Sequence, residues 1–325
     1  VQDDKILARA SYIGAPILDA QGDAAFWVQQ DNRWTLLWKG RPAPGTPFSA
    51  RGSNTSPTEV SPPAFSLDGR HVAYSRRGAD GRYVVVRDGK SGTAYLSVGD
   101  PVFSPDSASM AYGAAAGPDY ELNTLVLDDR IISQVQPKGG PPLSIRSLWG
   151  YRFLRNGRLT WFAALAGGKS CFILGDDTSA DYDSVAQPAF DPGSRRAAFA
   201  GFRDMKAHAV VDGEDGPPYD AVAFLQFDEE GRRFAYTAKV GTSSLVVLDG
   251  VAGELFDEVG WVRFTPGDKG IAFWARKGSR WQTEPTRRNS DTSVRADKVG
   301  NLILAGSDGS VPVYSVSENG AWHLI

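Results

Sequence analysis

The stretch of sequence that decides the fold is "FDEEGRRFAYT", Phe227–Thr237. Nearly the same phrase occurs 37 residues earlier as "FDPGSRRAAFA", from Phe190, and 37 residues later as "FTPGDKGIAFW", from Phe264. Seven copies along 325 residues average about 46 residues each, which is typical of propeller blade repeats. The four other copies are less regular and begin at Leu18, Phe65, Phe103 and Phe153.

Each phrase predicts two short strands joined by a turn. Asp-Gly, Asn-Gly and Pro-Gly pairs supply the turn, because glycine adopts positive φ without steric cost. A third strand and a second turn follow in "AHAVVDGEDG" from Ala207 and in "SSLVVLDGVAG" from Ser244. A further short segment, such as "YDAVAFLQF", leads into the next phrase. The pattern therefore predicts four strands in each repeat and no amphipathic helix.

Repeated four-stranded units predict an all-β fold, namely a β-propeller of seven blades, with six or eight blades as alternatives. An all-β sandwich or two stacked barrels would be the competing architecture, but neither predicts three phrases at equal spacing. We expect residues 1–325 to form a single propeller domain. The N-terminal "KILARASYI" is expected to close the ring by adding a strand to the last blade.

The phrase F-S-P-D-G-[RK]-x-[IVL]-A-[YF] resembles the WD-like repeats of TolB-type propellers, which also occur in the propellers of prolyl-oligopeptidase-like enzymes. The stretches "VVDGEDGPPYDAV" and "VVLDGVAGELFDEV" strengthen this resemblance, which covers Leu18 to Phe273. It implies a propeller fold but no single function, because the repeat occurs in proteins with many roles. The α/β domain that precedes the propeller in TolB is not evident, and no peptidase domain follows, so peptidase activity is not expected.

The composition is that of a soluble globular protein, with 42% hydrophobic and 22% charged residues. A formal net charge of −3 disfavours general nucleic-acid binding. No apolar stretch is long enough to span a bilayer. The single cysteine, Cys171, excludes an intrachain disulfide. The chain begins "VQDDKI" without methionine, which favours a removed leader and a periplasmic or extracellular location, with the cytoplasm as the alternative.

A search for catalytic and metal-binding motifs predicts no catalytic residues, no metal site and no cofactor. The G-x-S-x-G pattern of a nucleophile elbow does not occur. The chain has three histidines, His71, His208 and His323, and no spacing typical of a zinc site. The acidic stretch "GDDTSADYD" lacks the glycine and the final glutamate of an EF-hand loop.

The turns are expected to divide between two faces. With the strands of each repeat named A to D, the A–B and C–D turns lie at one side and the B–C turns and D–A connections at the other. The C–D turns are mostly acidic, whereas the B–C turns are basic. The basic residues of the B–C turns are Arg76, Arg77, Lys169, Arg203, Lys206, Lys239, Arg276, Lys277 and Arg280. The D–A connections add Trp149, Tyr151, Trp261 and Arg263, and the loop from Arg276 adds Trp281, Arg287 and Arg288.

Arginine and aromatic residues are enriched where interfaces concentrate their binding energy, and a basic face favours an anionic partner. We therefore expect a non-catalytic binding module or scaffold that recognises a protein or a small anionic ligand through this face. The alternative is a propeller enzyme, a lyase or hydrolase acting on a saccharide or peptide in a central channel. A third hypothesis is a structural subunit of an envelope assembly. The competing explanation of the basic face is that polar turns carry lysine and arginine for solubility alone.

Overall fold

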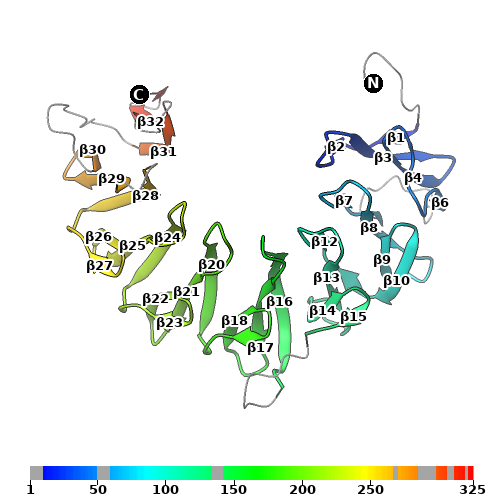
Figure 1. The fold of residues 1–325 in the computed structure, drawn as a ribbon, viewed down its shortest axis with the longest axis horizontal. Helices are drawn as coiled ribbons and strands as arrows, with labels where there is room; N and C mark the ends of the chain where they lie inside the picture. Colours follow the sequence, from blue (N-terminus) through cyan, green and yellow to red (C-terminus); the bar gives the residue numbers. More distant parts are fainter. Residues whose placement is uncertain are drawn as a thin grey trace. The chain divides into compact units, whose positions relative to one another are not determined.

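A computed structural model describes residues 10–49, 59–133, 142–265, 270–284, 298–305, 311–318 and 321–324. These residues contain no α-helix and form eight antiparallel sheets that follow one another along the chain (Figure 1). We number them sheets 1 to 8. The chain divides into two compact units, residues 1–179 with sheets 1 to 4 and residues 180–325 with sheets 5 to 8.

The first unit contains four sheets of four to six strands. Sheet 1 consists of β1 (Tyr12–Ile13), β2 (Ile17–Leu18), β3 (Ala24–Gln30), β4 (Arg33–Trp38), β5 (Arg41–Pro42) and β6 (Phe48–Ser49). Sheet 2 consists of β7 (Ala64–Phe65), β8 (Val72–Arg77), β9 (Tyr83–Arg87) and β10 (Lys90–Tyr95). Sheet 3 consists of β11 (Ser97–Val98), β12 (Val102–Phe103), β13 (Met110–Ala115), β14 (Thr124–Leu127) and β15 (Arg130–Ile131). Sheet 4 consists of β16 (Ile145–Phe153), β17 (Leu159–Leu165), β18 (Ser170–Leu174) and β19 (Asp177–Thr178).

The second unit contains two sheets of four strands and two of three. Sheet 5 consists of β20 (Ser184–Phe190), β21 (Ala197–Arg203), β22 (Lys206–Val211) and β23 (Glu214–Asp215). Sheet 6 consists of β24 (Ala221–Phe227), β25 (Phe234–Val240), β26 (Ser243–Leu248) and β27 (Val251–Ala252). Sheet 7 consists of β28 (Glu258–Phe264), β29 (Ile271–Lys277) and β30 (Arg280–Glu284). Sheet 8 consists of β31 (Lys298–Ala305), β32 (Val311–Glu318) and β33 (Ala321–Leu324).

The expected all-β fold of repeated four-stranded antiparallel units is confirmed. In sheets 4, 5 and 6 the four strands pair in chain order, as the A to D assignment requires. The C–D turns of sheets 5 and 6 place Asp212 and Gly213, and Asp249 and Gly250, in the left-handed region with φ of 53° and 90°, and of 51° and 81°. Two such residues in succession form the hairpin turn that suits the strand twist.

The predicted number of seven blades is not confirmed. The described residues form eight sheets, because β31, β32 and β33 form sheet 8 although residues 298–324 contain no copy of the phrase. Of the segment expected to close the ring, Tyr12–Ile13 pairs with β3 in sheet 1, and residues 5–9 lie outside the described residues. Ring closure by the N-terminal segment stays a prediction.

Apolar side chains are buried between consecutive sheets. One core cluster joins Ala200 and Ala209 of sheet 5 to Val222, Phe227 and Tyr236 of sheet 6. Others join sheets 1 and 2 and sheets 3 and 4 in the same way. The B strands lie deepest, as their nearly continuous burial shows: all six residues of β13 are buried. In these pairs the two sheets share one core, so each sheet of a pair depends on its neighbour for stability.

The polar residues of the phrase hold its turn and its neighbours together. In sheet 6 the Asp228 carboxylate Oδ1 accepts hydrogen bonds from the backbone N–H groups of Arg232 (2.7 Å) and Arg233 (3.0 Å). The Nε of Arg233 donates to Oδ2 of Asp249 at 3.0 Å, and Oδ1 of Asp249 accepts from the Phe234 N–H at 2.8 Å. The two aspartates therefore fix both turns at this end of the sheet.

The same arginine reaches the next sheet. The Arg233 guanidinium lies 5.8 Å from the ring centroid of Phe264 in sheet 7. In sheet 5, Arg196 bonds to Asp212 at 2.8 Å and lies 5.0 Å from the ring of Phe227 in sheet 6. We call this arrangement a latch: a basic residue after the A–B turn, the aspartate of the C–D turn, and the phenylalanine that ends the next sheet's A strand. In sheet 2 His71 takes the basic position, 2.7 Å from Asp88.

Candidate functional site

The A strands of sheets 4 to 7 are each interrupted by a bulge at an equivalent position. The pairing of these strands with their neighbours shifts register after Trp149, Ala186, Ala223 and Val259. The residue at the bulge is Gly150, Gln187, Phe224 or Trp261, and these four positions are 37 residues apart. Bulges bend a strand and redirect side chains, and they are frequent beside binding sites. The repeat therefore presents one redirected position in each of these sheets.

Phe224 occupies its bulge in a strained conformation. Its φ is +54°, in the left-handed region that a bulky side chain rarely adopts. Gly150 has a φ of +64° at the equivalent position, where glycine carries no such cost. Strain of this kind costs about 1–3 kcal/mol and persists where the surrounding structure imposes it, often at functional sites. Its aromatic side chain is thus held half-buried at a position where glycine is the less costly residue.

Trp261 and Arg263 extend the aromatic surface that Phe224 begins. The ring centroids of Phe224 and Trp261 are 4.6 Å apart with an interplanar angle of 34°, so the two rings pack in a tilted arrangement across sheets 6 and 7. The Arg263 guanidinium carbon lies 5.2 Å from the Trp261 ring. Trp261 keeps 41% of its surface exposed in spite of these contacts. We call these three side chains the aromatic platform.

Two of the predicted basic residues in sheet 5 are neutralised by nearby carboxylates. Arg203 forms an ion pair with Asp215, and Lys206 Nζ lies 2.6 Å from Asp220 Oδ1. The Lys206 hydrogen bond is the main reason that the pKa of Asp220 is lowered, with a smaller contribution from Lys239. Acidic residues between the strands of sheets 5 and 6 therefore reduce the positive charge that the B–C turns carry in the sequence.

The same neutralisation occurs in sheet 7. Arg276 Nε lies 3.4 Å from Glu258 Oε2, and Lys277 pairs with Glu254. Trp281, predicted as a binding residue, is buried with 7% exposure and lies beneath Arg276, so it belongs to the packing of this sheet. Arg280 is exposed, whereas Arg287 and Arg288 lie outside the described residues. Among the described residues of sheets 5 to 7, four of the predicted cations are thus paired with carboxylates.

Exposed apolar side chains are prominent at the B–C turns of the second unit. Met205, in the turn between β21 and β22, is 97% exposed, and Val240 at the end of β25 is 47% exposed. Both residues belong to the same end of their sheets as the paired cations. Exposed apolar groups rimmed by charged pairs are typical of a surface that contacts another protein. Lys239 precedes Val240 and is itself exposed.

In the first unit, Arg77 lines a cleft of about 630 Å³ together with Asp80, Arg82, Tyr83 and Tyr120. The Arg77 Nε donates to the Gly81 carbonyl at 3.1 Å, and its guanidinium lies 5.6 Å from the Tyr83 ring. Tyr120 is 62% exposed. Arg76 points elsewhere, because its guanidinium lies over Phe48 of sheet 1 at 5.1 Å.

Trp149 and Tyr151 in sheet 4 have different environments. Trp149 is 38% exposed and stacks on Phe162 at 5.8 Å. Tyr151 packs against the core between sheets 3 and 4 and donates its hydroxyl to the Asp100 carbonyl at 2.7 Å. Burial raises the pKa of Tyr151 to about 12, so its hydroxyl stays protonated at neutral pH. Tyr151 is therefore a packing residue rather than part of an open surface. Lys169, in the same sheet's B–C turn, is exposed.

Comparison with known proteins finds no matching family model and no matching curated protein. Among solved structures the chain is similar to TolB from Acinetobacter baumannii, with 14% identity over 75% of this chain and a TM-score of 0.32. It spans 64% of that TolB chain. The resemblance to TolB-type propellers expected from the repeated phrase is thus found again among solved structures.

Two other solved structures show a similar degree of likeness. The β-propeller domain of the Trilobed protease from Pyrococcus furiosus is 10% identical, over 88% of this chain and 98% of that one, with a TM-score of 0.36. The dihydro-heme d1 dehydrogenase NirN is 15% identical, over 95% of this chain and 70% of that one, with a TM-score of 0.39.

The described residues contain no group of three or more histidine, cysteine, aspartate or glutamate side chains placed to hold a metal ion. In the same part of the chain there is no helix with the length and apolar character needed to cross a membrane.

Proposed function

We propose that the protein is a binding module that recognises a protein partner through the aromatic platform and the B–C turns of its second unit. The tilted ring contact of Phe224 with Trp261, with Phe224 held at a φ of +54°, is the observation that carries this proposal. The bulge keeps the two rings at the sheet edge before any partner arrives, so little conformational entropy is lost on binding.

The composition of the surface favours a protein over a small anion. Tryptophan and arginine are the residues that most often dominate the energy of an interface. Four of the predicted cations, Arg203, Lys206, Arg276 and Lys277, already have carboxylate partners, so an anion would have to compete with them. Met205 and Val240 add apolar area that a protein surface can cover. The expectation of an anionic ligand is therefore the less supported of the two.

Selection of binding peptides from a displayed random library would test the proposal. The same library would be applied to the wild-type protein and to the Trp261→Ser variant. Val251→Ser is the matched control, because Val251 is 71% exposed in the C–D hairpin of sheet 6, at the opposite end of the sheet. We expect peptides that bind the wild-type protein and Val251→Ser alike but bind Trp261→Ser at least about tenfold more weakly. Equal binding to all three proteins would refute the proposed surface.

The alternative of an enzyme with a site in a central channel stays a prediction, as does the periplasmic or extracellular location. The selected peptides would also distinguish the binding module from the enzyme. Cleavage of a selected peptide on incubation with the protein would favour the enzyme hypothesis.

A further inference from the structure

The boundary between sheets 3 and 4 differs from the boundaries that carry a latch. In sheet 2, His71 and Arg87 both lie against Phe103 of sheet 3, with centroid distances of 6.3 Å and 5.4 Å. The equivalent positions in sheet 3 are Ser109 and Leu127, and the next phenylalanine is Phe153. Neither replacement is a cation. In the part of the chain that the structure describes, no cationic side chain lies over Phe153.

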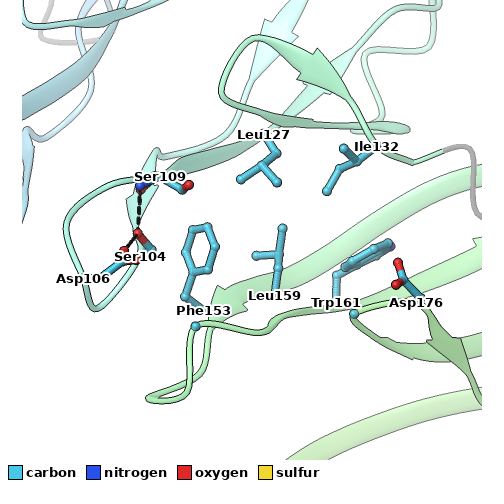
Figure 2. Close-up of a pocket in the computed structure, with 11 residues that line it drawn as sticks. Ser104, Asp106, Ser109, Leu127, Ile132, Phe153, Leu159, Trp161 and Asp176 are labelled. Atoms are coloured by element: carbon cyan, nitrogen blue, oxygen red, sulfur yellow. Dashed lines mark hydrogen bonds between the residues drawn. The ribbon is translucent and has the colours of Figure 1, made fainter.

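A pocket of about 430 Å³ occupies the place where the latch would lie. Phe153, Leu159 and Trp161 of sheet 4 form one wall, and Leu127 of sheet 3 and Ile132, which directly follows β15, face them (Figure 2). Ser109 lines the pocket near the Phe153 end. The serine side chain is several atoms shorter than the arginine at this position in sheets 5 and 6. The pocket is therefore the volume that the missing basic side chain would fill.

Two carboxylates lie at the ends of this pocket. Figure 2 shows Asp106 beside Ser104 and Ser109 at one end and Asp176 beyond Trp161 at the other. Among the described residues neither carboxylate forms an ion pair, whereas the aspartates of the latches do. The Ser104 hydroxyl donates to Asp106 at 2.5 Å and is the main cause of the lowered pKa of Asp106. Asp106 is thus a carboxylate at neutral pH.

We propose that this pocket binds an arginine side chain presented by a partner polypeptide. A guanidinium group is planar and weakly hydrated, so it stacks on aromatic rings more readily than an ammonium group does. The protein itself fills the equivalent space with Arg196 and Arg233, each over a phenylalanine ring. The partner's guanidinium takes that place over Phe153, with Asp106 as its counter-ion.

The geometry of the Arg196 latch indicates which further groups the guest would meet. Besides Asp212, Arg196 donates to the carbonyls of Gly231 (3.2 Å) and Arg232 (3.1 Å) in the A–B turn of sheet 6. Gly157 stands in the corresponding turn of sheet 4 and lines the pocket. The indole N–H of Trp161, a residue with 2% exposure, has no hydrogen-bond partner among the described residues. A polypeptide guest carries carbonyl groups that could accept this hydrogen bond, which a free cation does not.

The experiment is a calorimetric titration: the full chain is titrated with the probe acetyl-Gly-Arg-Gly-amide, and the heat of binding is measured at constant temperature. We expect a Kd on the order of 1 mM or tighter, since one side chain contributes the binding. The same peptide with citrulline, an uncharged isostere of arginine, should bind at least about tenfold more weakly. In the Ser109→Arg variant the protein's own arginine would fill the pocket, so this variant should not bind the probe. Its circular dichroism spectrum should be like that of the wild type, which would show that the variant is folded.

Two further variants keep the test valid if Ser109→Arg does not fold. Asp106→Asn and Asp176→Asn should each lower the affinity for the arginine probe by about three- to tenfold. Asp68→Asn is the control for Asp106→Asn, because Asp68 accepts the same hydroxyl hydrogen bond, from Ser66 at 2.6 Å, but does not line the pocket. Its affinity for the probe should equal that of the wild type. Absence of probe binding, equal binding of the citrulline peptide, or unchanged binding by Ser109→Arg would each overturn the proposal.

Discussion

The guanidinium of Arg196 in sheet 5 lies 5.0 Å from the ring centroid of Phe227 in sheet 6, and these two residues belong to consecutive copies of one phrase. The acidic and basic residues of the phrase resemble a catalytic cluster when they are read in isolation. Their contacts show that they fix turns and join neighbouring sheets. This explains why the arginine and the phenylalanine recur together, since each latch needs the arginine of one copy and the phenylalanine of the next copy.

The Arg196→Ala variant should be less stable than the wild type by about 1–2 kcal/mol, because it loses a cation–π contact and a partly buried ion pair. Chemical denaturation of both proteins would measure the difference. Arg195→Ala is the matched control, because the Arg195 side chain is 78% exposed and its Nε comes no nearer than 4.0 Å to a carboxylate oxygen of Asp191. An equal loss of stability in the two variants would show that the latch contributes nothing specific.

Substitution of Gln187 by glycine should raise the stability by about 0.5–1 kcal/mol, because the residue is exposed and its φ is +53°. Ser184 lies in the same strand, is also exposed and has no positive φ. Ser184→Gly should therefore change the stability in the opposite direction, by about 0.5–1 kcal/mol. Thermal unfolding of the two variants would reveal the difference in sign, and a loss in both would contradict the strained bulge.

Trp281→Ala should destabilise the protein by about 3 kcal/mol or more, because a buried tryptophan leaves a large cavity. Trp261→Ala should have a much smaller effect on unfolding, since 41% of that side chain is exposed. Denaturant titrations of both variants would test this. If Trp261→Ala were the more destabilising of the two, the platform would be a structural contact and not an available surface.

Acidification should remove stability that the turn aspartates supply. The pKa of Asp68 and that of Asp106 are lowered, chiefly by the hydroxyl groups of Ser66 and Ser104. A group with a lowered folded-state pKa stabilises the protein above its unfolded pKa, and this contribution is lost as the pH falls through the folded value. The wild type should therefore lose stability below about pH 4. The Ser66→Ala and Ser104→Ala variants should show a shallower loss when unfolding is measured from pH 6 to pH 3.

Much of the fold could be predicted from the sequence, because the turns depend on local residues. The Asp-Gly pairs at residues 212–213 and 249–250 require left-handed backbone that few other residue types adopt, so they mark hairpins without tertiary information. Eight blades rather than seven stayed an alternative from the sequence, because residues 298–324 contain no copy of the phrase even though "NLILAGSDG" and "VPVYSVSENG" resemble strand–turn pairs. Strand propensity depends on context, so it leaves a weaker signal than a repeated turn.

The site was less accessible to sequence reasoning, because charge depends on contacts that the sequence does not list. Lys206 is paired with Asp220, 14 residues away, and Lys277 with Glu254, 23 residues away. Trp281 resembled a residue of a charged loop, although it forms part of β30 and is buried. Phe224 was overlooked in "YDAVAFLQF", yet its position 37 residues before Trp261 was an available signal.

The latch also bears on how such a chain changes over evolutionary time. The latches of Arg196 and Arg233 each reach from one sheet to the next, and the two arginines hold equivalent positions in their repeats. Duplication of the repeat that carries Arg196 or Arg233 would again place an arginine next to a phenylalanine at the equivalent position. Such a duplication needs no compensating substitution at the new boundary, whereas a breakpoint between Arg196 and Asp212 would separate the arginine from its aspartate.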